Sequence, residues 1–362
     1  MSYERDNIRQ MTGYTSGEQP VDASTLKLNT NENPYPPSPQ VQVRLNDLRI
    51  ESLRTYPHPT ADPLRDLLAV THAVHRENIV VTHGGDEALR LAVTTYVEPG
   101  AAFGMTDPSY SLYPVLAQIH GARVVKIALD DNWHLPRNFA DELNEAGANL
   151  ACIVNPHAPS GTLTDTDRIS QLAESLNGVL LVDEAYVDFV DPALRYDAVR
   201  LVNAFDNLLI LRTFSKGYSL AGLRLGYLIG AAPLIEPLVQ KTRDSFNIDY
   251  ISQQLGEAAI TDRAYAEQTW ANVRAARRLL RDDLVGLGFA VNPSQSNFLL
   301  VEVPLALPMT AEQIYLALKD AGILVRYFDT PLLDDKLRIT VGTEGQNRQL
   351  INVLKTALNS CS

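Results

Sequence analysis

The sequence predicts an α/β protein with a large domain, whose mixed and mostly parallel sheet is covered by helices on both faces, and a smaller α+β domain. Two observations predict this fold class. From about residue 60 to residue 230, short aliphatic runs alternate with helical patterns, which is typical of parallel strands buried on both faces. After about Phe246 this alternation stops, and a long helical stretch leads into fewer strands. A length of 362 residues suits roughly two domains.

The expected strands of the large domain are short runs rich in β-branched and aliphatic residues. Helical patterns separate these runs, so neighbouring strands should mostly be parallel. Ligands of such sheets bind beyond the carboxyl ends of the strands, and polar residues that follow the runs are therefore candidates for a site. The runs are Ile79–Thr82, Ala102–Met105, Arg123–Ile127, Leu150–Val154, Val179–Val182, Leu208–Leu211 and Leu225–Ile229.

The smaller domain is expected in the C-terminal part of the chain. A final helix should begin near Thr343, because Thr343 and Gln346 match a capping box. The earlier helices and strands of this domain are expected near Ala264–Leu287, Phe298–Glu302, Ala311–Ala321, Ile323–Arg326 and Leu337–Thr340.

The N-terminal segment has no core of its own. Four prolines between Asn31 and Pro39 exclude a regular helix or a central strand there, and composition alone would make this stretch a surface linker. We therefore expect residues 1–50 to pack with the small domain, residues 51–260 to form the large domain and residues 261–362 to form the small one.

Composition and charge exclude several classes of function. The chain has 31 basic and 43 acidic residues, and the resulting charge of −12 argues against broad binding to nucleic acids or anionic membranes. The apolar runs are far shorter than the ~20 residues that span a bilayer, and no signal core follows the polar N-terminus. Cys152 and Cys361 fit no disulfide or zinc pattern. We expect a cytoplasmic protein without a metal, in which His72 and His75 are a solvated pair on a helix.

A Gly-Gly turn follows the first expected strand, in the segment Thr82–Leu89. Free backbone N–H groups at the start of the next helix would point at an anion, and the helix dipole would favour its charge. The alternative is an ordinary tight turn, in which Asp86 and Glu87 are common first-turn acids.

Asp183 ends an apolar strand, where an unpaired carboxylate would be costly to bury. It therefore needs a cation or several hydrogen-bond donors. A protonated heterocycle, a metal or a simple capping role would each satisfy it. The metal is disfavoured, because no group of His, Cys and carboxylate residues at metal-ligand spacing lies nearby in the sequence.

Lys216 also follows a strand, and Thr213, Ser215 and Arg224 flank it. Hydroxyls with a guanidinium suit a phosphate group, and a desolvated lysine suits Schiff-base chemistry. The alternative is a solvated surface lysine, which is less favoured at a strand end among residues of this kind.

Asn155 and Tyr110 follow two further strands. Asn155 could donate to a ligand oxygen or could shape a turn, and Tyr110 could stack on a flat ligand or pack in the core. The sheet edge would then combine an anion cradle, a carboxylate, an aromatic plate, amide and phenol donors and a lysine. This is the set of groups that pyridoxal phosphate requires.

The chain resembles fold-type I pyridoxal-phosphate aminotransferases, and most of all the histidinol-phosphate aminotransferase family. The resemblance is carried by Thr213–Arg224, by the Asn-rich segment Leu28–Tyr35 and by Leu337–Thr343. It implies a homodimeric enzyme of histidine biosynthesis. Its reaction would be transamination of histidinol phosphate with 2-oxoglutarate, which gives imidazole acetol phosphate and glutamate.

The resemblance also implies roles for individual residues. Lys216 would be the catalytic amine joined to the cofactor, Asp183 would pair with the pyridine nitrogen, and Tyr110 would stack on the ring. Asn155 and Tyr186 would bind the phenolic oxygen of the cofactor. Its phosphate would be held by the backbone of Gly85 and Asp86, by Thr213, Ser215 and Arg224, and by Tyr56 from the other subunit. Substrate would be bound by Tyr14, Arg326 and Arg338.

Two departures from the family pattern stand out. The loop after Asn155 reads Pro-His-Ala-Pro-Ser-Gly instead of the usual Pro-Asn-Asn-Pro-Thr-Gly, and Gly85 replaces a usual serine. The competing functions are an aromatic amino-acid aminotransferase and a threonine-phosphate decarboxylase. A non-enzymatic relative is disfavoured by Lys216, Asp183 and Arg224, and a dinucleotide-dependent oxidoreductase by the missing G-x-G-x-x-G spacing.

Overall fold

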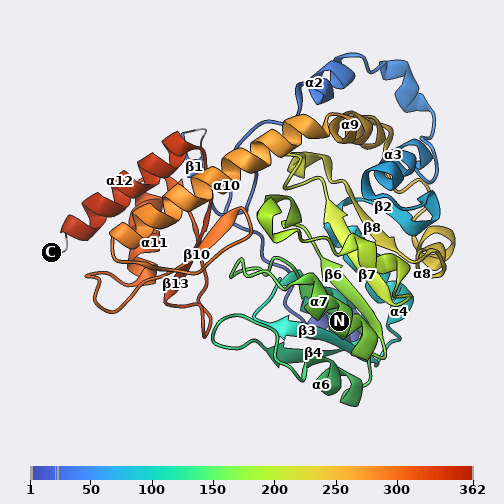
Figure 1. The fold of residues 1–362 in the computed structure, drawn as a ribbon, viewed down its shortest axis with the longest axis horizontal. Helices are drawn as coiled ribbons and strands as arrows, with labels where there is room; N and C mark the ends of the chain where they lie inside the picture. The colour runs from blue at the N-terminus through green and yellow to red at the C-terminus, as the bar shows by residue number, and fades with distance from the viewer. Residues whose placement is uncertain (1–2, 21, 23, 361–362) are drawn as a thin grey trace.

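A seven-stranded sheet forms the centre of the protein, in a computed structural model that describes residues 3–20, 22 and 24–360. The strand order is β2-β8-β7-β6-β5-β3-β4 (Figure 1), and only β8 runs antiparallel to its neighbours. All the strands predicted for this sheet are confirmed. Their bounds are β2 (Ile79–Thr82), β3 (Ala102–Asp107), β4 (Arg123–Ala128), β5 (Ala148–Val154), β6 (Val179–Asp183), β7 (Leu208–Thr213) and β8 (Gly226–Gly230).

Helices cover both faces of this large sheet, as the apolar runs predicted. Side chains alternate between two apolar cores, so that Leu180 and Val182 lie in one core and Leu181 lies in the other. The covering helices are α3 (Asp62–His72), α4 (Gly84–Tyr96), α5 (Leu112–His120), α6 (Phe139–Glu145), α7 (Thr166–Ser175), α8 (Ala232–Pro237) and α9 (Tyr250–Thr261). Short helical turns are η1 (Ile50–Arg54), η2 (Arg76–Asn78), η3 (Val187–Phe189), η4 (Pro192–Leu194), η5 (Val199–Asn203), η6 (Ala221–Leu223) and η7 (Leu238–Thr242).

A smaller antiparallel sheet follows the long helix α10 (Arg263–Gly286), which runs from beside α9 to this sheet (Figure 1). Its strand order is β12-β13-β10-β9. The Thr343 capping box is confirmed, since the Thr343 amide donates to Gln346 Oε1 at 2.8 Å. The bounds are β9 (Ala290–Val291), β10 (Phe298–Glu302), α11 (Ala311–Asp320), β12 (Arg326–Tyr327), β13 (Lys336–Thr340) and α12 (Glu344–Ser360).

One expected strand, Ile323–Arg326, is divided in the structure. Its first half is β11 (Ile323–Leu324), which pairs in parallel with β1 (Leu26–Lys27), whereas β12 pairs with β13. The division places Arg326 on the small sheet, directly opposite Arg338.

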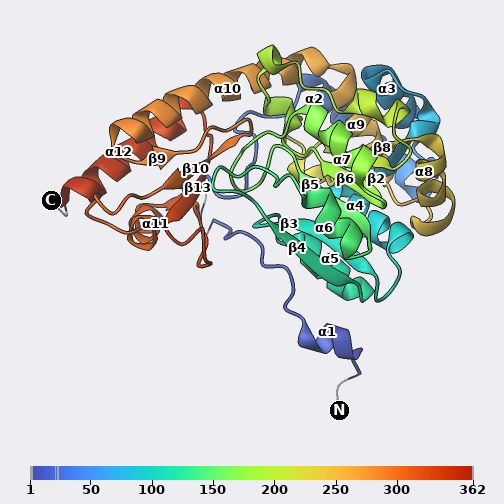
Figure 2. The same ribbon diagram turned by 60° about the horizontal axis from the view of Figure 1, so that its bottom comes forward.

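The first fifty residues contact elements next to the small sheet and helices that cover the large sheet. β1 joins β11, α1 (Asp6–Gln10) lies against α5, and α2 (Pro39–Asn46) packs along α9. Figure 2 shows an extended segment that connects α1 to the rest of the chain. The stretch from Asn31 to Ser38 is irregular, as its prolines predicted. The domain limits at residues 50 and 260 stay a prediction.

His72 corrects the expectation of a solvated histidine pair. Its Nε2 lies 2.8 Å from the Tyr227 hydroxyl, and burial lowers the pKa of His72 to about 3. His75 is exposed, as expected. No helix among the described residues is long and apolar enough to cross a membrane.

Candidate active site

The predicted site residues gather at the carboxyl ends of β5, β6 and β7, where ligands of such sheets bind. Lys216 stands three residues after β7, and its Nζ donates to the carbonyl oxygen of Thr30 at 2.7 Å. The N-terminal segment therefore reaches the amine of Lys216. The same Nζ lies 5.9 Å from the centroid of the Tyr186 ring.

Burial sets the protonation state of Lys216. Desolvation lowers its pKa to about 8, and the cations of Arg338 and Arg224 act in the same direction, while Glu32 opposes them. A lysine of this kind is neutral in a large fraction of molecules slightly above neutral pH, so it can act as a nucleophile or a base. The alternative of a solvated surface lysine is therefore wrong.

Asp183 is a buried carboxylate without a cation. Its Oδ2 accepts a hydrogen bond from the Tyr113 hydroxyl at 2.8 Å, and its Oδ1 accepts one from the Ala185 amide at 3.1 Å. No lysine, arginine or histidine in the described part of the chain forms an ion pair with it, and burial raises the pKa of Asp183 to about 6. A protonated ring nitrogen would supply the missing charge.

Tyr113 is the partner of Asp183 that the sequence did not reveal. It is almost fully buried and lies three residues after Tyr110, with ring centroids 5.5 Å apart. The spacing of three residues was the available signal, because the Tyr113 amide donates to the Tyr110 carbonyl at 3.2 Å in the turn that leads into α5 (Leu112–His120), which keeps the two rings close.

An anion cradle lies where α4 begins. Gly84 has φ +74°, and a Cβ at this position would come within 2.7 Å of Arg224 Nη2. Glycine is therefore needed for the close approach of the guanidinium to the helix N-terminus. Arg224 donates to Ser215 Oγ at 3.3 Å and to Asp86 Oδ2 at 3.2 Å, so these three predicted phosphate ligands lie together at the start of α4. An incoming phosphate would compete with Asp86 for Arg224.

Two side chains that were expected to contact the cofactor, Thr213 and Asn155, form hydrogen bonds within the protein. The Thr213 hydroxyl donates to the carbonyl of Leu225 at 3.2 Å and accepts from the Ser215 amide. The Asn155 amide nitrogen donates to the Thr164 carbonyl at 2.9 Å and to the Tyr196 hydroxyl at 2.8 Å. In this arrangement both side chains brace their loops, and their direct contact with a cofactor stays a prediction.

Three tyrosines, Tyr14, Tyr110 and Tyr186, lie close to one another at the site. The Tyr110 ring meets the Tyr14 ring edge-on, with centroids 5.9 Å apart, and its hydroxyl lies 3.4 Å from Asp86 Oδ1. Tyr14 thus joins the site from the N-terminal segment. Tyr186 accepts a hydrogen bond from Asn31 Nδ2 at 3.1 Å, so a second part of that segment closes the same site.

Arg326 and Arg338 face each other across β12 and β13. Arg338 donates to the Asn29 carbonyl at 3.0 Å, and its buried Nε has no partner in the described structure. Neither arginine forms an ion pair with any described residue, and burial lowers the pKa of Arg338. Two uncompensated cations side by side form a site for an oxyanion.

Comparison with known proteins agrees with this geometry. The profile of the family described as aminotransferase class I and II matches residues 23–354. Histidinol-phosphate aminotransferase 1 of Trichormus variabilis is 42% identical over 358 residues, which cover 99% of each protein. The histidinol-phosphate aminotransferase of Chromohalobacter salexigens is 44% identical over 352 residues, which cover 96% of this chain and 97% of the relative. The chain belongs to the histidinol-phosphate aminotransferase family.

The fold of this family member is also that of a solved relative. The crystal structure of histidinol-phosphate aminotransferase from Sinorhizobium meliloti in complex with pyridoxal-5'-phosphate superposes with a TM-score of 0.90. The match covers 100% of this chain and 99% of the other at 22% identity. The predicted fold type I is therefore confirmed.

The residues of this histidinol-phosphate aminotransferase family member fit pyridoxal phosphate. Asp183 is a buried anion without a cation, Lys216 is a partly buried amine with a lowered pKa, and Arg224 stands at a helix N-terminus where a Cβ on Gly84 would obstruct it. A cationic ring, an aldehyde and a phosphate match these features in turn. Among the described residues, no group of three or more His, Cys, Asp or Glu side chains could hold a metal ion.

Tyr56 is the one predicted site residue that the fold of a single chain leaves apart. It is 81% exposed, and its ring stacks on Phe246 with centroids 4.5 Å apart. No contact joins it to Lys216 or Arg224 within the described chain. Its role at the site stays a prediction.

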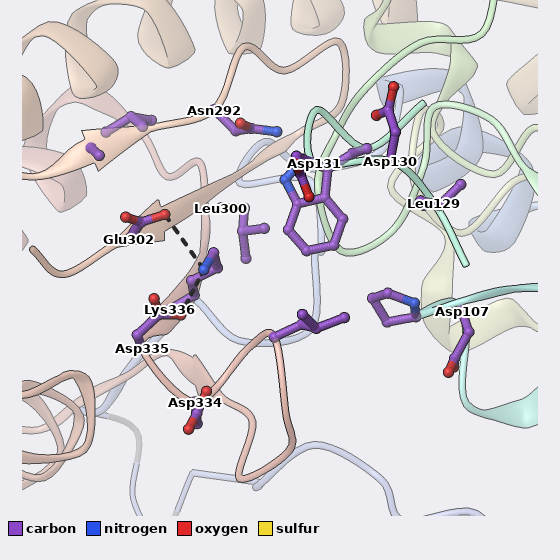
Figure 3. Close-up of a pocket in the computed structure, with 15 residues that line it drawn as sticks. Asp107, Leu129, Asp130, Asp131, Asn292, Leu300, Glu302, Asp334, Asp335 and Lys336 are labelled. Atoms are coloured by element: carbon purple, nitrogen blue, oxygen red, sulfur yellow. Dashed lines mark hydrogen bonds and ion pairs between the residues drawn. The ribbon is translucent and has the colours of Figure 1, made fainter. Parts of the chain in front are cut away.

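A cavity of about 450 Å³ lies between the end of β3 and the small sheet (Figure 3). Its wall includes Leu300, which is directly opposite Arg338, and Lys336, which pairs with Glu302 and Asp335. The cavity therefore borders the arginine pair on the same sheet. None of the predicted cofactor or substrate residues lines it.

Proposed function

We propose that this enzyme transfers the amino group of histidinol phosphate to 2-oxoglutarate, with pyridoxal phosphate as cofactor, and that it serves histidine biosynthesis. The observation that carries the proposal is the pair of uncompensated arginines, Arg326 and Arg338, the second of which is close enough to Lys216 to lower its pKa. A phosphorylated donor and a dicarboxylate acceptor both need such cations. The names of the relatives support the same substrate.

In this proposal Lys216 would hold the cofactor covalently, and Asp183 would pair with its ring nitrogen. Arg224, Ser215 and the backbone at Gly85 and Asp86 hold its phosphate. When bound, the cofactor supplies a cationic ring that withdraws the electron pair left at the amine-bearing carbon of the substrate. Thr213 and Asn155 support this site through the loops that they brace.

The protein groups then perform binding and proton transfer. Lys216 Nζ would take the proton from the amine-bearing carbon of the substrate, since its lowered pKa leaves the amine neutral at a mildly alkaline pH. Asp183 would keep the ring nitrogen protonated, and the Tyr113 hydroxyl, which donates to Asp183 Oδ2 at 2.8 Å, fixes the orientation of that carboxylate. Arg326 and Arg338 bind the phosphate of the donor and a carboxylate of the acceptor in turn.

We also propose that the active form is a homodimer in which the partner subunit's Tyr56 reaches the cofactor phosphate. Support comes from an exposed apolar face around η1, made by Ile50 and Leu53 of η1 and by Tyr56, whose ring stacks on that of the exposed Phe246, since exposed apolar patches are typical of interfaces. A cytoplasmic location belongs to the same proposal, and the free thiol of Cys152 is compatible with it.

A substrate panel tests the proposal. Purified enzyme with pyridoxal phosphate is assayed for glutamate formation from 2-oxoglutarate with histidinol phosphate, histidinol, phenylalanine or threonine phosphate. We expect the highest kcat/KM for histidinol phosphate and a large loss for histidinol, which lacks only the phosphate. A preference for phenylalanine would instead indicate an aromatic aminotransferase. Carbon dioxide release from threonine phosphate would indicate a decarboxylase.

A further inference from the structure

Phe328 lies between the two arginines of the proposed substrate site. The guanidinium carbon of Arg326 is 5.4 Å from the centroid of the Phe328 ring, and that of Arg338 is 5.7 Å from it. The two arginines are directly opposite each other on antiparallel strands, a position in which like charges repel. The electron-rich ring attracts both cations, and it offsets part of this repulsion while the site holds no anion.

The two arginines are held very differently. Arg338 donates to the Asn29 carbonyl at 3.0 Å and also lies over the Phe298 ring, with its guanidinium carbon 5.3 Å from the centroid. The side chain of Arg326 has no hydrogen bond or ion pair with any residue that the structure describes, and its ring contact is with Phe328. Arg338 is therefore fixed independently of Phe328, whereas the position of Arg326 depends on it.

We propose that Phe328 is a specificity-determining residue, which holds Arg326 where a phosphate dianion binds both guanidiniums. The proposal rests on the proposed function, from which it takes the phosphate. A phosphate carries about two charges at neutral pH, whereas a carboxylate carries one and is matched by a single guanidinium fork. Displacement of Arg326 should therefore weaken binding of the phosphorylated donor more than binding of the carboxylate acceptor.

The neighbouring aromatic residue supplies a matched control. Tyr327 stacks on Tyr315, with centroids 5.8 Å apart and an interplanar angle of 25°. Successive residues of a strand point to opposite faces, so Tyr327 is an aromatic of the same strand that faces away from the arginines. Tyr327→Leu also replaces an aromatic ring by leucine, as Phe328→Leu does, but it leaves Arg326 untouched.

The experiment compares Phe328→Leu, Phe328→Tyr and Tyr327→Leu in enzyme loaded with pyridoxal phosphate, so that the cofactor's own phosphate site is filled. Inorganic phosphate is titrated by calorimetry, and steady-state constants are measured for donor and acceptor. Loss of one cation–π contact predicts a Kd for phosphate and a KM for histidinol phosphate about fivefold higher in Phe328→Leu. We expect kcat and the acceptor's KM to change less than about twofold. Phe328→Tyr keeps an aromatic ring between the two arginines, and Tyr327→Leu leaves Phe328 and both arginines unchanged. Both variants should therefore have the phosphate Kd and the donor KM of the parent enzyme.

A double-mutant cycle with Arg326→Gln separates action through Arg326 from simple packing. We expect Phe328→Leu to add nothing to the effect of Arg326→Gln, because the group that Phe328 holds is then already absent. A further severalfold loss in the double variant, or an unchanged phosphate affinity in Phe328→Leu, would overturn the proposal.

If Phe328→Leu does not fold, Phe328→Met repeats the test at similar volume. Failure of the parent enzyme to use histidinol phosphate would overturn the proposed function, while the phosphate titration would still decide the role of Phe328.

Discussion

At the scale of single residues, Lys216 and Asp183 show that a charged residue at the end of a strand can be identified from the sequence as a candidate site residue. Both follow apolar runs, where a charged side chain needs a specific reason to be present, and both could be predicted from the sequence. The hydrogen bonds of Asn155 and Thr213 could not, because their partners Tyr196 and Leu225 are brought close only by the fold. Residue type therefore identified the candidate site residues, but it could not show whether the hydrogen-bond donors of Asn155 and Thr213 were free to bind a cofactor.

The capture of cofactor by Lys216 should depend on pH. Its pKa is lowered to about 8, and the neutral amine is the form that reacts with an aldehyde, so the rate should rise as the pH increases from 6 through about 8 and then level off. The measurement is the growth of the cofactor's bound absorbance band in cofactor-free enzyme. Lys216→Ala should form no such band and have no turnover. A rate that keeps rising towards the ordinary pKa of lysine would contradict the lowered value.

Asp183→Asn should stabilise the cofactor-free protein while it impairs the enzyme. Burial raises the pKa of Asp183 from 3.8 to about 6. The folded state therefore favours the protonated carboxyl. As a result, the free energy of unfolding of the cofactor-free protein falls as the pH rises from about 4 to above 6. At pH 8 the variant should be more stable by about 3 kcal/mol, from ~1.4 kcal/mol per pKa unit.

The check is urea unfolding of both cofactor-free proteins at pH 4 and pH 8. Near pH 4 the difference should nearly vanish, because Asp183 is then protonated in the parent protein too. In the loaded enzyme the same substitution should lower kcat by about 10²–10³-fold, since it removes the charge that faces the ring nitrogen. A variant that is less stable at pH 8 would show that burial of this charge is not unfavourable.

At the scale of helices and strands, periodicity predicted every strand of the large sheet and the three helices of the small domain, α10, α11 and α12. The strands that it missed, β1 and β9, have two residues each, which is too short for a pattern. Such strands exist only because a partner lies alongside: Leu26 pairs with Ile323, and Val291 pairs with Val301. The same pairing divides the expected strand Ile323–Arg326, so the position of Arg326 opposite Arg338 could not be predicted.

The start of α4 offers a test of the anion cradle. Gly84→Ala should reduce stability by about 1–2 kcal/mol, because φ is +74°. It should also weaken cofactor binding, because the added Cβ would come within 2.7 Å of Arg224. Gly100→Ala is the matched control, with φ +86° and no atom within 4 Å of the added Cβ. Thermal unfolding should show a similar loss for both variants, whereas the Kd of pyridoxal phosphate should rise only in Gly84→Ala. Equal Kd values would remove Gly84 from the cradle.

At the scale of the whole molecule, the single chain brings together all the predicted site residues except Tyr56. Its exposed ring and the apolar face around η1 lead us to expect that a second copy covers them. Because a two-fold interface is reciprocal, each subunit would lend Tyr56 to its partner and receive one in return. This arrangement predicts an activity for mixed dimers that differs from the activity expected if Tyr56 acted within its own chain.

A dimer that joins one Lys216→Ala subunit to one Tyr56→Ala subunit tests this exchange. If Tyr56 acts across the interface, the Tyr56→Ala subunit keeps its own Lys216 and receives an intact tyrosine from its partner. One complete site then forms, and the purified mixed dimer should regain about half of the parent activity at limiting cofactor. If Tyr56 acts within its own chain, each subunit lacks one essential group, and the mixed dimer should be no more active than the two variants alone. Two different affinity tags isolate the mixed species, and a dimer with two parent subunits is the reference. Complementation thus requires both a dimer and a shared site, since neither feature alone can restore a complete set of residues.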